Sequence, residues 1–456
     1  MLRRVIGKEL LDCVYGYRSL VVFILATTLF SIAVATGAQR YQTALQEFRF
    51  AKTAERQRVA EPNNLYALGN FGIDIVKPPA LLSIFVSGVE FHAPRVFNVD
   101  LYKVPESRGS TAEENLASAV FGPLDLAFIV EVVLGMAAIL FTFSTICGEK
   151  ENGTLKLQLA NALPKDVLLV GKLIGNLIGL LVPVGLAFLV GFALLLDFRD
   201  ISVTRDAVIR IALLGIGFLL YLTVLFALGV FVSTLTARST TAFALSLVAW
   251  VLLVAIVPRL AVLAARQISP VEPLQEFEMK KTEVHRRGSI EAQKELNTYV
   301  RQHDGESVPD AVYYDLLRRV REKQNRELKI LDDDYLQQKQ RQERWDLILS
   351  RLSPAGSVSY AAMSLAQTGL QRDLRFQAAV RDYRAIFTRY YDRKSDELVN
   401  QSENRQDLSD LPDFNFQDEP LSASLDRALP DLGFLVVWCF VLFAGAYVNF
   451  LRYDVR

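Results

Sequence analysis

Cysteine and histidine are scarce in this chain, since its 456 residues include only 3 of each. Cys13, Cys147 and Cys439 lie in or beside long apolar runs, and none falls in the polar segments 38–123 and 266–429. Those two segments therefore fold without disulfides even in an oxidising compartment. No Cys/His cluster has the spacing of a zinc site, so the sequence predicts no bound metal.

Nucleotide-binding and hydrolase motifs are also missing. The chain has no G-x-x-x-x-G-K-[ST] loop, no H-E-x-x-H pair and no G-x-S-x-G elbow. These absences argue against ATP binding by such a loop, zinc proteolysis and serine hydrolysis. The 50 Lys/Arg balance the 50 Asp/Glu, so the basic footprint of a nucleic-acid-binding protein is lacking. We expect neither an enzyme nor a nucleic-acid partner.

Long apolar runs are what the chain does have. Each is close to the roughly 20 residues that a helix needs to cross the hydrocarbon core of a bilayer. The runs are 19–37, 124–146, 172–196, 208–233, 240–264 and 431–451. We therefore predict an all-α, multi-pass membrane protein with six transmembrane helices.

Basic residues predict the orientation, because they concentrate in the short loops on one side of the membrane, which the positive-inside rule assigns to the cytoplasm. They are Arg3, Arg4, Lys8, Arg18, Lys150, Lys156, Lys165, Lys172, Arg238, Arg452 and Arg456. In the short loop 197–207 on the other side, Arg199 and Arg205 are offset by aspartates. Both termini are expected in the cytoplasm, and the segments 38–123 and 265–430 outside it.

The first residues, 1–18, alternate apolar and basic side chains with the period of a helix. Such a basic amphipathic helix ahead of a span is typical of a segment that lies in the membrane interface. An unremarkable cytoplasmic leader is the alternative.

The extracytoplasmic segment 265–430 is predicted to be mainly helical. Residues 311–353 lack internal Pro and Gly and carry a narrow apolar stripe. This stripe fits either a coiled-coil-like hairpin or an amphipathic helix on a compact bundle. A small-residue stretch, 355–369, is expected to connect this helix to the next, and residues 404–420 read as a loop before the last span.

The smaller extracytoplasmic segment, 38–123, begins with a polar helix at about 39–60 and contains an apolar run, 80–89. That run is too short to span a bilayer. It is either a re-entrant or interfacial element or part of the core of the outer domain, and we favour the second interpretation.

A charged segment follows the second span, within the predicted cytoplasmic stretch 147–171. It reads Gly148-Glu149-Lys150-Glu151-Asn152-Gly153-Thr154-Leu155, and Leu163-Pro164-Lys165 follows before the third span. Asn-Gly favours a turn after a short helix. With this Glu-x-x-x-Gly-Thr-Leu pattern, the Pro-Lys element, the amphipathic leader and the six spans, the chain resembles the permease subunits of ABC exporters, the type-2 exporter superfamily. It looks most like the branch with a large extracytoplasmic domain between the fifth and sixth spans.

The resemblance implies that the segment after the second span docks on a separate ATP-binding subunit. Carried over by position, the coupling residues are Glu149, Lys150, Gly153, Thr154, Leu155, Pro164 and Lys165. A solvated loop with a turn is the alternative. The resemblance also implies two permeases, identical or paralogous, with two ATP-binding subunits that hold ATP and Mg²⁺, so this chain itself binds no cofactor. It further implies a bacterial inner membrane with the outer domains in the periplasm.

Small and ionisable residues inside the spans add two more candidates. Gly171, Gly175 and Gly179 have the spacing that lets helices approach closely in lipid, either within one chain or between two. Glu131 and Arg259 lie at similar depth, where a charge costs at least ~2.5 kcal/mol, and could pair. Glu131 otherwise faces a central cavity or gate, and Arg210, near the end of its span, could snorkel to the interface.

Two functions remain open at this stage. One is export of an unidentified substrate, powered by the ATP-binding subunit. The other is energy transduction without transport, in which the ATP cycle moves the large extracytoplasmic domain against a periplasmic partner. The large share of the chain in the extracytoplasmic segments supports the second function.

Overall fold

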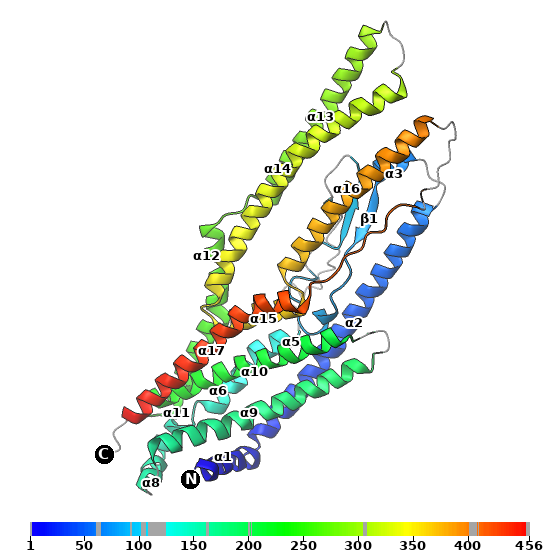
Figure 1. The fold of residues 1–456 in the computed structure, drawn as a ribbon. Coiled ribbons are helices and arrows are strands. Elements are labelled where there is room, and N and C mark those ends of the chain that lie inside the picture. Colours follow the sequence, from blue (N-terminus) through cyan, green and yellow to red (C-terminus); the bar gives the residue numbers. More distant parts are fainter. Residues whose placement is uncertain are drawn as a thin grey trace.

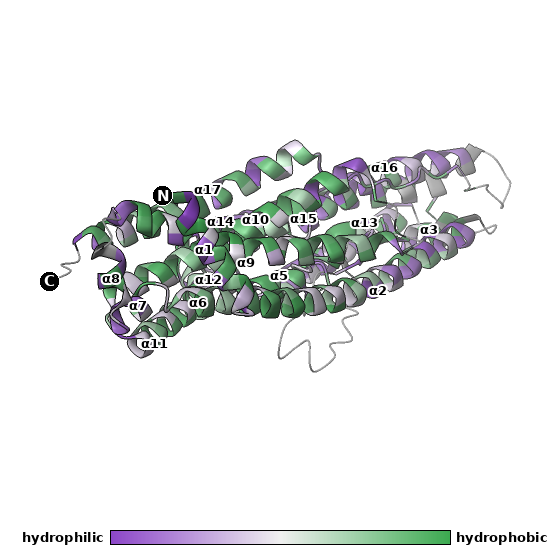
Figure 2. Ribbon diagram, turned by 90° about the horizontal axis from the view of Figure 1, so that it is seen from below, coloured by the Kyte–Doolittle hydropathy of each residue, from purple (hydrophilic) through white to green (hydrophobic). Residues whose placement is uncertain are grey.

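The computed structural model of the chain describes residues 2–60, 65–91, 94–101, 106–107, 125–160, 164–198, 201, 203–303, 308–400, 408 and 410–452. Within these residues, six helices are long and apolar enough to cross a membrane, as predicted. The predicted positions 161–163, 404–407, Arg199 and Arg456 lie outside the described residues. Hydrophobic residues dominate the spans, and hydrophilic residues concentrate on α16 and the far end of α2 (Figure 2).

The helices of the six spans run beside one another in the lower half of Figure 1. Two of the spans contain π-helical turns, η2 and η3, between α-helical parts. The span elements are α2 (Arg18–Ala60), α5 (Leu126–Phe128), η2 (Ile129–Leu134), α6 (Gly135–Thr142), α9 (Lys165–Leu196), α10 (Arg205–Leu235), α11 (Ser239–Trp250), η3 (Val251–Ile256), α12 (Val257–Ile268) and α17 (Leu421–Arg452). The first span and the polar helix predicted after it are one helix, α2, and α17 begins ten residues before the predicted start of the last span at 431.

One end of the molecule carries both termini and short helices, and the other carries the outer domain (Figure 1). The short helices are α1 (Leu2–Tyr15), α7 (Cys147–Glu151) and α8 (Thr154–Ala160). The outer elements are α3 (Leu65–Phe71), β1 (Ile73–Val76), η1 (Leu81–Ile84), β2 (Val96–Val99), β3 (Glu106–Ser107), α13 (Leu274–Gln302), α14 (Asp310–Ser350), α15 (Pro354–Ala366) and α16 (Leu370–Asn400).

The fourth span, α10, forms the centre of the membrane body. Its apolar stretch is 67% buried, whereas that of the fifth span, α11–η3–α12, is only 6% buried. Tyr221, Leu225 and Phe226 of α10 are fully enclosed by neighbouring spans. The fourth span is therefore largely enclosed by the rest of the chain, whereas most of the fifth span is accessible on the surface of the membrane body.

Two segments that the sequence assigned outside the spans pack among them. Helix α15 buries Ala355, Val358 and Leu365 in the same core as α10 and α17, so the stretch 355–369 is more than a connector. The run 80–89 joins that core too, and the Phe85 ring lies 6.4 Å from the Phe188 ring of α9. The favoured interpretation of residues 80–89, packing in the core of the outer domain, was wrong, because their apolar side chains pack against the spans.

Gly37 of α2 allows this close approach, and we predict that a larger residue at this position destabilises the fold. A Cβ on Gly37 would lie 2.2 Å from the backbone oxygen of Ile84. Gly37→Ala should therefore force the two backbones apart and destabilise the fold by about 1–3 kcal/mol, lowering the midpoint of thermal unfolding in detergent. Gly185→Ala is the matched control, since nothing lies within 4 Å of its Cβ position. Equal midpoints for the two variants would contradict the packing of residues 80–89.

The two outer segments share one hydrophobic core. An antiparallel sheet, with strands in the order β1-β2-β3, packs Ile75 and Phe97 against Phe376 and Phe387 of α16. No secondary structure was predicted from the sequence for these strands, and the sheet was missed. Helices α13 and α14 form the hairpin alternative for 311–353, with Phe277 stacked on Tyr335 at a ring distance of 4.1 Å.

Candidate functional site

Helices α7 and α8 form a small projection at the end of the molecule that holds both termini (Figure 1). The chain turns between them at Asn152 and Gly153, and Gly153 has a φ of 73°. Positive φ values suit glycine, which explains this residue at the turn. The predicted coupling segment is thus a pair of short helices joined by a tight turn.

A buried ion cluster ties this projection to the helices behind it. Lys172 of α9, whose side chain is 3% exposed, donates to Glu149 of α7 at 2.6 Å and to Glu9 of α1 at 2.8 Å. Asn176 donates to the other oxygen of Glu9 at 3.1 Å and accepts from the Cys13 thiol at 3.2 Å. Buried charges are tolerated only when they are paired and hydrogen-bonded. Removing Lys172 would therefore leave the carboxylates of Glu9 and Glu149 without the cation that they share.

The three glycines of α9 let α1 approach closely enough to complete that cluster. A Cβ at any of them would crowd a side chain of α1. The neighbours are Val5 Cγ1 at 2.7 Å for Gly171, Glu9 Cβ at 2.6 Å for Gly175 and Cys13 Sγ at 3.0 Å for Gly179. Of the two alternatives for this glycine stripe, the described chain uses packing within one chain. Burial and the nearby Glu9 raise the pKa of the Cys13 thiol to about 11, as expected of an unreactive packing residue.

The other side of α7 is tied to the turn between α10 and α11. Lys150 donates to the carbonyl oxygens of Thr234 at 2.6 Å and Thr236 at 3.2 Å. Glu151 accepts from the backbone N–H of Ser239 at 2.9 Å, at the start of α11. Helix α7 therefore contacts three spans, α9, α10 and α11, and a displacement of α7 would act on all three.

The remaining coupling positions frame the projection. Thr154 is exposed and donates to the Glu149 carbonyl at 3.4 Å. Pro164 is exposed immediately before α9, and Lys165 in the first turn of α9 donates to the carbonyl of Leu451 in α17 at 3.4 Å.

Helix α8 has an apolar side chain on each face. Leu155 is buried and anchors the helix, whereas Leu157 is 69% exposed beside the exposed Lys156. The residues that share the small core with Leu155 are Ile146, Leu168, Leu169 and Phe450. A single exposed leucine is common on protein surfaces, so Leu157 shows only that this face of α8 is uncovered in the described chain.

Four residues of this site were not predicted as site residues from the sequence, namely Glu9, Lys172, Asn176 and Leu157. A signal for three of them was present. Lys172 and Asn176 are polar residues one helical turn apart at the start of an apolar span, and Glu9 lies on the otherwise apolar face of α1. No sequence signal separates Leu157 from Leu155, because only the packing tells which of them is covered.

The pair of Glu131 and Arg259 does not form in the described chain. Glu131 Oε1 accepts a hydrogen bond from Ser359 of α15 at 2.6 Å, and its carbonyl oxygen accepts one from Tyr221 at 2.8 Å. Arg259 is exposed on α12 and has no ion pair within the described residues. The reason is α15, which lies beside η2 and supplies the partner of Glu131.

Arg210 does not snorkel to the interface. It is 2% exposed, pairs with Asp206 at 2.6 Å and donates to the carbonyl oxygens of Leu365 at 3.2 Å and Glu419 at 2.9 Å. Arg210 instead fastens α10 to the end of α15 and to the segment that leads into α17.

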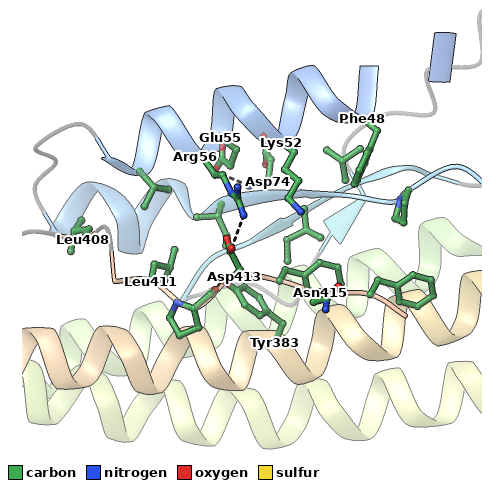
Figure 3. A pocket seen from close by; sticks show the side chains of 18 residues that line it. Phe48, Lys52, Glu55, Arg56, Asp74, Tyr383, Leu408, Leu411, Asp413 and Asn415 are labelled. Atoms are coloured by element: carbon green, nitrogen blue, oxygen red, sulfur yellow. Dashed lines mark hydrogen bonds and ion pairs between the residues drawn. The ribbon is translucent and has the colours of Figure 1, made fainter. Parts of the chain in front are cut away.

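A hollow lies in the outer domain, between α2, β1 and residues 408 and 411–416 (Figure 3). It has a volume of about 560 Å³, within the range of ligand sites. An ion pair between Arg56 and Asp413, with atoms 2.6 Å apart, crosses it, and Lys52 lies beside that pair. Phe48, Tyr383, Phe414 and Phe416 supply aromatic walls.

The model of a family described as ABC-2 family transporter protein matches residues 3–455, which is nearly the whole chain. No curated protein matches the chain.

Proposed function

This chain belongs to the ABC-2 family of transporter proteins, and we propose on that premise that it couples ATP hydrolysis by a separate subunit to export of a substrate. It is a multi-pass transmembrane permease of an ABC transporter. The observation that carries the proposal is the Glu9–Lys172–Glu149 cluster. It makes α1, α7 and the start of α9 one mechanical unit, so a force on the α7–α8 projection moves the spans.

The α7–α8 projection would face the cytoplasm, where ATP is available. Exposed basic side chains support this orientation, namely Arg3, Arg4 and Lys8 on α1 and Lys156 on α8. The C-terminal end of α17 lies at the same end of the molecule (Figure 1). The outer domain would then lie across the membrane, in the periplasm of a bacterial cell.

The fifth span supports a second permease as partner, identical or paralogous. Only 6% of its apolar stretch is buried, and Arg259 lies exposed on its surface. A charge facing lipid at that depth costs at least ~2.5 kcal/mol, whereas a protein neighbour can supply a partner. The complete unit would be two permeases with two ATP-binding subunits, which hold ATP and Mg²⁺.

Purification tests the proposal. Tagged protein extracted in mild detergent from its native membranes should carry a stoichiometric ATP-binding subunit and a second permease. The ATPase activity of that complex should fall when Glu149 is replaced by Ala, because the projection loses its link to Lys172. Recovery of the chain alone from membranes that natively express it would contradict the proposal.

Energy transduction without transport is the second candidate, and the outer domain favours it. Its aromatic and charged hollow offers a place for a periplasmic partner, and the α13–α14 hairpin projects well beyond the spans. For this function, the ATPase rate of the purified complex should respond to an extracytoplasmic protein and not to small molecules. Stimulation by a small molecule alone would favour export.

A further inference from the structure

A second hollow lies where the outer domain meets the ends of the fifth and sixth spans. Its volume is about 570 Å³. Parts of α12, α14, α15, α16 and α17 line it, so segments distant in sequence converge there. This place differs from the outer hollow of Figure 3, because two of its walls, α12 and α17, are membrane spans.

Its walls are held by contacts between elements. Arg351 at the end of α14 pairs with Asp431 of α17 at 2.6 Å. Gln371 of α16 donates to Glu343 of α14 at 2.8 Å, and Arg375 pairs with Glu419 at 3.4 Å. These contacts hold the side chains around the hollow in place.

Several charged groups of the lining remain unmatched by these pairs. Lys339 has no carboxylate within ion-pair distance in the described chain, and its ammonium lies 4.8 Å from the centre of the Tyr335 ring. Glu343 lies one turn further along α14, yet its described partner is the neutral Gln371. Arg266 at the outer end of α12 also lacks an ion-pair partner within the described residues. Burial lowers the pKa of Lys339 and raises that of Glu343, because it disfavours the charged form of each group, and it outweighs the opposing effects of Asp373 on Lys339 and of Arg427 on Glu343.

Part of the lining is apolar and comes from α12, α14 and α15, namely Val262, Ala265, Leu347 and Met363. The Arg351 guanidinium lies 5.9 Å from the centre of the Phe434 ring, which continues the apolar surface down α17.

We infer that this hollow binds a zwitterionic phospholipid-like amphiphile. Its phosphate would lie near Lys339 and Arg266, its ammonium near Glu343, and an acyl chain would follow α12 and α17. Lys339 and Glu343, which form no ion pair with each other, suit a head group that carries one negative and one positive charge. The apolar wall at the membrane level fits a tail. A free head group would leave that wall exposed to water, which is why the lipid is favoured as the source of the head group.

Native mass spectrometry of the purified full chain tests this inference with phosphatidylethanolamine, phosphatidylglycerol and glycerophosphoethanolamine. We expect saturable binding of phosphatidylethanolamine, weaker binding of phosphatidylglycerol, and none of the tail-free head group. Lys339→Gln should weaken binding of both lipids about tenfold. Glu343→Gln should remove the preference for phosphatidylethanolamine, because it removes the acceptor for the ammonium.

Arg341→Gln and Arg344→Gln are the matched controls, since both side chains are exposed on the same helix and outside the lining. They should bind lipid as the unaltered chain does. A phosphatidylethanolamine with a photoreactive group in its acyl chain should also label α12 and α17 of the unaltered chain. Equal binding by all variants, tight binding of the tail-free head group, or labelling confined to other spans would overturn the inference. None of these readouts uses the ATP-binding subunit, so failure here leaves the proposed coupling untouched.

Discussion

Lys172→Met should lower the free energy of unfolding by about 3–5 kcal/mol, the usual cost of removing one partner from a buried ion pair. The ammonium of Lys172 is the only cation that contacts Glu9 and Glu149 among the described residues. Methionine fills a similar volume but leaves two carboxylates side by side. We expect a strongly reduced midpoint of thermal unfolding in detergent and less folded protein in the membrane.

The other members of the cluster provide a rescue that separates charge from shape. Adding Glu9→Gln and Glu149→Gln to Lys172→Met removes the stranded charges and should restore most of the lost stability. Lys165→Met is the control on the same helix, since Lys165 lies outside the cluster and donates to the Leu451 carbonyl of α17 at 3.4 Å. A midpoint for Lys172→Met equal to that of Lys165→Met would show that the cluster does not hold α1, α7 and α9 together.

Hydropathy was enough to predict the spans, because the signal is local to each run of residues. It was not enough to assign α15 or the run 80–89, which are too short to cross a bilayer yet pack against α10 and α2. Burial of such segments depends on the surface that other parts of the chain offer. The same reason explains why Leu155 and Leu157 look equivalent in sequence and differ in the fold.

Charge partners were predicted least well. Equal depth suggested that Glu131 and Arg259 could meet, but depth says nothing about direction around a helix axis. Glu131 faces α15, where it meets Ser359, and Arg259 faces outward. The short helix and the turn at Asn152 and Gly153 were predicted correctly, because both are local features of the sequence. What the motif did not reveal is that Glu149 faces inward, to Lys172.

This inward direction changes which residue should meet the ATP-binding subunit. Leu157 is 69% exposed on α8, and α8 is anchored from behind by Leu155. Under the proposed function, Leu157→Asp should reduce the amount of co-purified ATP-binding subunit by about tenfold or more, since it puts a charge into an apolar contact. The stability of the permease should be unchanged, because the side chain makes no contribution to the core behind α8.

Two further variants separate docking from general damage. Leu157→Ala should give an intermediate loss of the ATP-binding subunit, because it removes apolar area without adding charge. Ile290→Asp, at a side chain that is 55% exposed on α13 in the outer domain, should leave the complex intact. If Leu157→Asp retained its ATP-binding subunit and its ATPase activity, the exposed face of α8 would not be the docking surface. Coupling would then have to enter through the turn at Gly153 and Thr154, the other exposed part of the projection.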